Sequence, residues 1–286
     1  MTEWNDLYYQ VADGLTLYAR DYPGPSERAP VALLMHGLTR NSRDFQDLAP
    51  ALAKTHRVIV AEQRGRGSSE WDPNPARYEI PTYVGDMFEL LNQQSLSQVA
   101  AIGTSMGGLM SMAMNVARPG LFSHIVLNDI GPVLAEAGLN RIKSYVGPGD
   151  GTFPGWAEAE AYNREINGLA FPDYQEADWA RFTRQICVER EGRVALNYDP
   201  NIAKAMRDDE SAAVPPDLWP MFEALQPYKT LLIRGALSDL LDVPTTVEMQ
   251  RRHPDMEFIE VPNVGHAPML NESGVAERIA DFINDR

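Results

Sequence analysis

The stretch Val99–Leu109, with the sequence VAAIGTSMGGL, decides the fold. Val99–Ile102 is a short apolar run of the kind found in strands that are buried on both faces, and the residues from Met106 onward suit a helix. Between them, Gly103–Gly107 matches Gly-x-Ser-x-Gly, in which a serine projects from a sharp strand-to-helix turn. The motif alone is weak, since a glycine-rich turn can carry a serine with no chemical role. Its place between a strand and a helix makes Ser105 a candidate nucleophile.

Further strand-like runs share this apolar character, and helical patterns lie between them. The runs are Leu7–Ala12, Leu15–Asp21, Val31–Met35, Val58–Ala61, Ile125–Asn128, Thr230–Arg234 and Glu257–Val261. The helical patterns are Asp44–Lys54, Thr82–Gln93, Met106–Ala117, Thr245–His253 and Ser273–Asp285. Asp13-Gly14 joins the first two runs with a strong hairpin signal. This alternation predicts an α/β fold with a mostly parallel, eight-stranded sheet flanked by helices.

The alternation stops between about Pro132 and Leu225, where helical stretches punctuated by glycine and proline contain no clear buried strand. We interpret this region as a helical cap inserted into one α/β domain and lying over the strand ends. The predicted division is a core formed by residues 1–132 and 226–286, with a cap at residues 133–225.

Composition limits the partners. The 286 residues include 25 Lys and Arg against 40 Asp and Glu, a net charge of −15, which repels nucleic acid and anionic membrane surfaces. The single cysteine, Cys187, excludes an intramolecular disulfide. Met1–Asp6 lacks the basic and apolar runs of a signal peptide, and apolar runs such as Val31–Met35 are too short to span a bilayer. We expect a cytoplasmic protein with a small-molecule substrate, either a monomer or a homodimer.

A serine nucleophile needs a base within hydrogen-bond reach, and the chain offers five histidines. His56 and His124 precede strands and so lie at the wrong edge of a parallel sheet, while His253 ends a helix. His36 belongs to a turn discussed below. His266 follows the last strand and returns to the edge where Ser105 lies, which makes it the predicted base.

The base in turn needs a carboxylate that orients it. Asp239 follows the strand Thr230–Arg234 and completes the chain order Ser, Asp, His that is expected for such a triad. Two other carboxylates compete with it. We interpret Asp242 as a solvated loop residue and Asp129, which ends the strand after the serine turn, as an anchor for the cap. Asp239 is therefore the predicted acid.

Acyl transfer also needs donors for the oxyanion that develops on the substrate. The N–H group of Met106 is one candidate, because it lies at a helix N-terminus, where the helix dipole favours negative charge. The N–H group of Leu38 is the other, since Gly37 permits a tight turn after the strand Val31–Met35. His36 then braces this turn and is not a base.

These residues resemble those of the α/β-hydrolase-fold superfamily over essentially the whole chain. The resemblance rests on His36-Gly37, the turn Gln63-Arg64-Gly65-Arg66-Gly67-Ser68, the Ser105 turn, Asp239 and Gly265-His266. It implies a serine hydrolase. Members that are haloalkane dehalogenases or epoxide hydrolases carry an aspartate in place of Ser105, so this serine argues against both activities.

The cap is rich in aromatic residues, which favours an apolar substrate pocket. Trp156 and Trp219 are candidate substrate-binding residues. Arg40, close after the oxyanion turn, is a candidate for bidentate contact with a substrate carboxylate, and the alternative is an arginine that bridges to the cap. The acidic residues show no metal-ligand spacing, and we expect neither a metal nor a cofactor.

The sequence thus predicts a serine hydrolase that cleaves carboxylic esters of small to medium, largely apolar substrates through an acyl-enzyme. A C–C bond hydrolase acting on meta-cleavage products and an enol-lactone hydrolase would use the same triad and remain alternatives. A non-catalytic receptor for a small ligand is the alternative from another class, since such proteins can keep the triad.

Overall fold

The central feature is one sheet whose strands follow the order β1-β2-β4-β3-β5-β6-β10-β11. The computed structural model describes residues 3–146, 149–204 and 217–285. The strands of the sheet are β1 (Asn5–Gln10), β2 (Thr16–Tyr22), β3 (Val31–Met35), β4 (Arg57–Glu62), β5 (Val99–Thr104), β6 (Phe122–Asn128), β10 (Lys229–Gly235) and β11 (Glu257–Val261). β2 is antiparallel to both its neighbours, and the other pairs are parallel. The predicted α/β-hydrolase fold with eight strands is confirmed.

Helices cover both faces of this sheet because its inner strands are apolar on both sides. Along β3, Leu33 and Met35 pack into one core layer while Ala32 and Leu34 pack into the other. The first layer is closed by α2 (Ile80–Gln93), α3 (Met106–Ala117), α8 (Trp219–Glu223) and α9 (Val243–Arg252). The second is closed by α1 (Leu48–Leu52) and α10 (Val275–Asn284).

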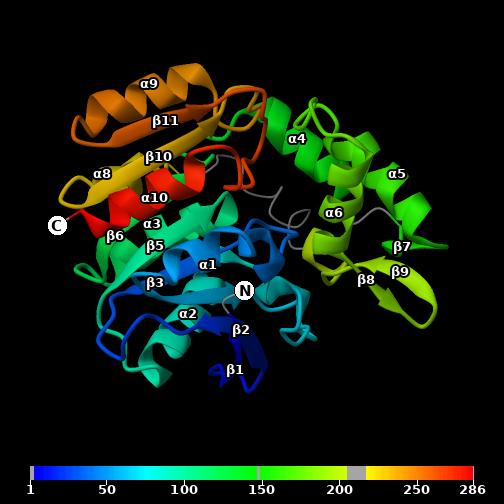
Figure 1. The fold of residues 1–286 in the computed structure, drawn as a ribbon, viewed down its shortest axis with the longest axis horizontal. Coiled ribbons are helices and arrows are strands. Elements are labelled where there is room, and N and C mark those ends of the chain that lie inside the picture. Colours follow the sequence, from blue (N-terminus) through cyan, green and yellow to red (C-terminus); the bar gives the residue numbers. More distant parts are fainter. Residues whose placement is uncertain (1–2, 147–148, 205–216, 286) are drawn as a thin grey trace.

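Residues 129–228, which connect β6 to β10, are here called the inserted segment. In Figure 1 most of it, coloured green to yellow-green, extends to the right of the sheet. Its main elements are α4 (Glu136–Tyr145), β7 (Thr152–Phe153), α5 (Trp156–Asn167), α6 (Glu176–Ile186), β8 (Cys187–Arg190) and β9 (Arg193–Leu196). The three strands form a separate antiparallel sheet in the order β7-β9-β8. The prediction of an insertion without strands is therefore wrong.

The last helix of the inserted segment, α8, packs on the core. The Nδ2 of Asn115 in α3 donates to the carbonyl of Ala224, directly after α8, at 2.9 Å. α4 is also held by the core, since the N–H of Ala135 donates to the carbonyl of Leu240 at 2.9 Å. Both ends of the segment are thus fixed against the sheet domain, and the division at residues 133 and 225 stays a prediction.

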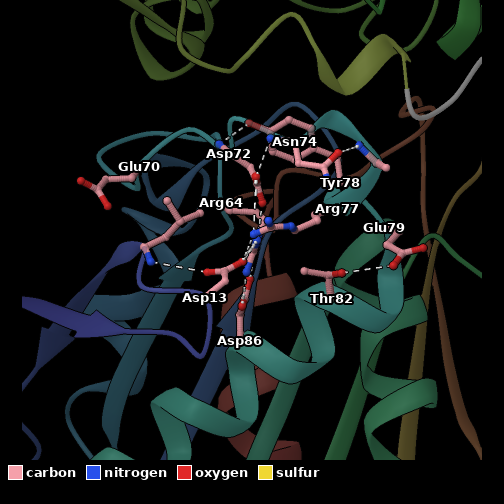
Figure 2. A network of polar contacts seen from close by, with 12 residues as sticks. Asp13, Arg64, Glu70, Asp72, Asn74, Arg77, Tyr78, Glu79, Thr82 and Asp86 are labelled. Atoms are coloured by element: carbon pink, nitrogen blue, oxygen red, sulfur yellow. Dashed lines mark hydrogen bonds and ion pairs between the residues drawn. The ribbon is translucent and has the colours of Figure 1, made fainter.

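Arg64, from the turn that follows β4, is buried in a cluster of carboxylates (Figure 2). Its Nε donates to Asp86 of α2 at 2.8 Å and its Nη1 to Asp13 at 2.7 Å, and it is also paired with Asp72. Burial lowers the pKa of Arg64, but the hydrogen bonds that it donates to Asp86 and Asp13 outweigh this effect, so the net shift of the pKa is upward. The cluster ties this turn to the β1–β2 hairpin and to α2.

No helix in residues 3–146, 149–204 or 217–285 combines the length and the apolar character needed to cross a membrane.

Candidate active site

Ser105 lies at the turn between β5 and α3, as the motif predicts. Its backbone has φ = 51°, a left-handed conformation that is costly for a residue with a side chain. The neighbouring glycines are required by contact. A Cβ on Gly107 would lie 2.1 Å from the carbonyl oxygen of Met35, and one on Gly103 would lie 2.4 Å from the backbone of Gly107. Strand and helix therefore approach closely enough to push Ser105 out at the carboxyl edge of the sheet.

His266 reaches Ser105 from the loop after β11. The distance between Ser105 Oγ and His266 Nε2 is 2.9 Å, a hydrogen bond between nucleophile and base. The side chain of His266 is only 8% exposed, so bulk water has little access to this contact. The structure thus brings together the serine and the histidine that the sequence singled out.

The carboxylate on the other side of His266 is Asp129. Its Oδ2 lies 2.7 Å from His266 Nδ1. Asp129 is completely buried, and it also accepts hydrogen bonds from the N–H of Gly235 at 2.8 Å and from Ser238 Oγ at 2.6 Å. These donors hold the carboxylate in place beside the imidazole. With Nδ1–H donating to Asp129, the unprotonated Nε2 faces Ser105.

The prediction of Asp239 as the acid is therefore corrected. Asp239 is paired instead with Arg141 of α4, whose Nη2 lies 2.9 Å from Oδ1. Partial burial raises the pKa of Asp239, but the hydrogen bonds from Arg141 more than offset this and the net shift is downward. The N–H of Gly138 in α4 also donates to the carbonyl of Asp239 at 2.9 Å. The two aspartates have exchanged their predicted roles, since Asp239 is the one that anchors the inserted segment.

The third carboxylate, Asp242, is half-buried and begins a helix. It is the N-cap of α9, and its Oδ1 accepts from the N–H of Thr245 at 2.8 Å. Such a cap satisfies one of the free N–H groups of the first helical turn.

The two predicted oxyanion donors lie beside Ser105. Met106 is the first residue of α3, so its N–H has no carbonyl partner within the helix. Leu38 and Gly37 line the same cavity as Ser105. The role of these two N–H groups as oxyanion donors stays a prediction.

Arg66 contacts both of these residues and was not singled out from the sequence. Its Nε donates to the carbonyl of Leu38 at 2.8 Å, and its Nη2 lies 3.7 Å from the sulfur of Met106. The guanidinium is completely buried, and its Nη1 also donates to the carbonyl of Arg64 and to Tyr83 Oη. Arg66 therefore fixes the turn that carries the Leu38 N–H.

His36 braces the same turn from the other side, as expected. It is completely buried, its Nε2 accepts from the N–H of Gln63 at 3.1 Å, and its Nδ1 lies 2.7 Å from the carbonyl oxygen of Gly37. Burial lowers the pKa of His36 to about 3, so the ring is neutral at physiological pH.

A cavity of about 90 Å³ opens onto Ser105 and His266. One wall comes from the sheet domain and the other from the inserted segment. Side chains of the inserted segment that line it are Ile142, Tyr145, Tyr162, Asn163, Ile166, Asn167, Phe171, Ile186, Leu196 and Tyr198. The wall is mostly apolar and aromatic, as a pocket for a small organic substrate requires.

Of the three predicted substrate-binding residues, Arg40 lines the cavity and the two tryptophans do not. Arg40 lines the cavity, but its Nε is already bonded to Asp44 at 2.8 Å, and its guanidinium carbon lies 4.5 Å from the centre of the Phe182 ring. Trp156 and Trp219 lie outside the cavity and pack beneath arginine side chains, 4.2 Å and 4.0 Å from the guanidinium carbons. The prediction that these tryptophans form the pocket is wrong.

The comparisons with known proteins agree with this geometry. A model of the alpha/beta hydrolase family matches residues 32–278. The chain belongs to the alpha/beta hydrolase family.

Two relatives and one solved structure place this hydrolase within the family. It is 36% identical over 245 residues to a 3-hydroxybutyrate-oligomer hydrolase of Cupriavidus necator, covering 83% of each chain. It is 26% identical over 237 residues to a 2-(acetamidomethylene)succinate hydrolase of Mesorhizobium japonicum, covering 83% of this chain and 81% of the relative. The crystal structure of an alpha/beta hydrolase from Novosphingobium aromaticivorans DSM 12444 matches with a TM-score of 0.93 at 38% identity, over 99% of each chain.

Among the parts of the chain that the structure describes, no group of three or more His, Cys, Asp or Glu side chains is placed to hold a metal ion.

Proposed function

We propose that this hydrolase cleaves carboxylic esters by a serine mechanism. The observation that carries the proposal is the continuous chain of hydrogen bonds from Asp129 through His266 to Ser105, with distances of 2.7 and 2.9 Å. This is the arrangement in which an imidazole can take the proton of a serine hydroxyl while a buried carboxylate stabilises the imidazolium that forms.

The steps follow from the geometry. Ser105 Oγ attacks the acyl carbon while His266 Nε2 takes its proton, and the N–H groups of Leu38 and Met106 stabilise the oxyanion. His266 then gives the proton to the leaving alcohol, which leaves an ester between the acyl group and Ser105. A water molecule activated by His266 attacks this acyl-enzyme, releases the acid and restores Ser105.

Two features support small ester substrates. The cavity is small and mostly apolar, which favours short acyl chains over long ones. The relative from Cupriavidus necator is named for the hydrolysis of 3-hydroxybutyrate oligomers, whose units are joined by ester bonds. We propose the same bond type for this chain, with acyl groups of small to medium size.

The test is hydrolysis of p-nitrophenyl esters from acetate to decanoate by the wild type, Ser105→Ala and a matched control, Ser111→Ala. Ser111 lies in α3, the helix that follows the Ser105 turn, and it is buried. Its hydroxyl donates to the carbonyl of Gly107, and the residue does not line the cavity. We expect Ser105→Ala to lose turnover, Ser111→Ala to keep it, and the wild type to be fastest with short chains. Equal activity in Ser105→Ala would contradict the proposal. Wild-type protein that is inactive on every ester, while cleaving a vinylogous diketone or an enol-lactone, would move the assignment to those substrates.

A further inference from the structure

Asn163 presents a buried amide to the cavity that holds Ser105. It lies on α5, and its side chain is completely buried. Its Nδ2 has two long contacts, 3.3 Å to Thr183 Oγ1 and 3.8 Å to Cys187 Sγ. Its Oδ1 has no hydrogen-bond partner in the described part of the chain. Asn163 is also one of the residues that line the cavity.

A buried amide oxygen without a hydrogen-bond partner destabilises the folded protein, and nearly all buried polar groups in proteins have a partner. The cavity wall around it is supplied by apolar and aromatic side chains such as Ile142, Ile166 and Phe171. A hydrophobic residue would suit that wall better if the amide had no role. Its place in the cavity wall makes this oxygen accessible to a hydrogen-bond donor that enters the cavity.

The neighbouring asparagine makes the contrast clear. Asn167 lines the same cavity one helical turn further along α5. Its Nδ2 donates to the backbone carbonyl of Asn163 at 3.0 Å, so that amide is engaged within the helix. Of the two asparagines, Asn163 is the one that is completely buried and whose acceptor oxygen has no partner among the described residues.

We propose that the Asn163 amide binds a hydroxyl group of the substrate, so that this hydrolase prefers hydroxylated esters to plain esters of the same length. The inference rests on the proposed ester hydrolysis. A hydroxyl both donates and accepts, so it can donate to the open Oδ1 and accept from Nδ2, whose present contacts are long. A neutral hydroxyl suits this cavity better than a carboxylate does. The guanidinium of Arg40, which lines the cavity wall, is already paired with Asp44 and so is not free to bind an anionic group.

The hydroxyl could belong to the acyl part or to the alcohol part of the ester. Two matched pairs of substrates separate these cases: ethyl butyrate with ethyl 3-hydroxybutyrate, and butyl butyrate with 3-hydroxybutyl butyrate. We expect one of the two hydroxylated esters to exceed its plain partner in kcat/KM by about tenfold in the wild type, the effect of one neutral hydrogen bond to an otherwise unpaired group. This ratio falls to about one in Asn163→Leu and is kept in the control, Asn115→Leu, which removes another buried amide whose Oδ1 has no partner in the described residues but which does not line the cavity.

A binding measurement makes the test independent of turnover. Two matched pairs, butyrate with 3-hydroxybutyrate and 1-butanol with 1,3-butanediol, are titrated into the wild type and into Asn163→Leu, with Asn163→Ala in its place if the leucine variant does not fold. Tighter binding by the wild type of a hydroxylated ligand than of its plain partner, lost in the variant, supports the inference. The inference is overturned if the wild type binds and cleaves plain and hydroxylated compounds equally well. It is also overturned if the preference for hydroxylated compounds survives in Asn163→Leu. Failure of the proposed function is recognised separately, by turnover that does not depend on Ser105.

Discussion

The substitution Asp129→Asn tests which aspartate completes the triad. In the wild type, Asp129 accepts from the N–H of Gly235, from Ser238 Oγ and from His266 Nδ1, at 2.8, 2.6 and 2.7 Å. Asparagine has nearly the same shape but offers one acceptor oxygen. If that oxygen keeps the bond to Gly235, an NH₂ group faces Nδ1. The imidazole is then driven to the tautomer that carries its proton on Nε2, which can no longer take the proton of Ser105.

The expected magnitude is large. An acid-to-amide change of this kind lowers kcat by about 10⁴-fold, equivalent to about 5 kcal/mol of transition-state stabilisation. The matched control is Asp239→Asn. The Asp239 side chain is 32% exposed and paired with Arg141, so its loss is worth at most about 1 kcal/mol of stability and leaves kcat near the wild-type value.

The assay is steady-state hydrolysis of a short p-nitrophenyl ester by the wild type and both variants, with thermal unfolding to show that each is folded. A folded Asp129→Asn protein with near-normal kcat, or a larger loss in Asp239→Asn than in Asp129→Asn, would refute the assignment of the acid.

Further predictions concern the oxyanion turn and the backbone around it. In Arg66→Met, the Leu38 carbonyl loses its donor, and we expect kcat to fall by about tenfold with little change in KM; an unchanged kcat would argue against a positioning role. Since burial holds the pKa of His36 at about 3, below its unfolded value, folding stability is lost as pH falls from 7. Between pH 7 and 5 this histidine accounts for a loss of about 2 kcal/mol, so urea unfolding should show a weaker pH dependence in His36→Gln. Gly107→Ala should lose about 3 kcal/mol of stability, because its Cβ would collide with backbone. Gly85→Ala, where a Cβ on helix α2 meets nothing within 4 Å, should gain about 1 kcal/mol; similar unfolding midpoints for the two variants would contradict this account.

Much of the sheet domain could be predicted because its strands and helices are marked by patterns within short stretches of sequence. Inner strands such as β3 and β5 are buried on both faces and are therefore continuous apolar runs. The helix Met106–Ala117 was predicted at its observed bounds because a glycine turn precedes it. The strands β7–β9 were missed, since they have only two to four residues each, too few to show an alternating pattern.

The acid could not be chosen from the sequence for a different reason. β6 and β10 are neighbours in the sheet, and an aspartate follows each of them near the same edge. What separates Asp129 from Asp239 is the set of donors that reach each one, Ser238 for the first and Arg141 for the second. These contacts join residues about a hundred positions apart in the chain, so no local pattern reveals them.

The residues of the cavity wall could not be chosen from the sequence either. Tyr162 lines the cavity together with Ile166, one turn further along α5. Trp156 begins the same helix but stacks on Arg184 instead. Helical spacing groups residues on a face, but the packing of α5 against its neighbours decides which face meets the substrate.

Asp129 and Asp239 belong to different loops and have different roles, since the first holds the catalytic histidine and the second attaches the inserted segment. The proton relay uses the loop after β6, whereas the attachment of α4 uses the loop after β10, through Asp239 and Arg141. The side chains of Asp239 and Arg141 make no hydrogen bond to the triad, so a mutation of either one loosens the attachment and leaves the hydrogen bonds of the relay in place. The part of the molecule that selects the substrate can therefore diverge in evolution while the catalytic chemistry is inherited unchanged.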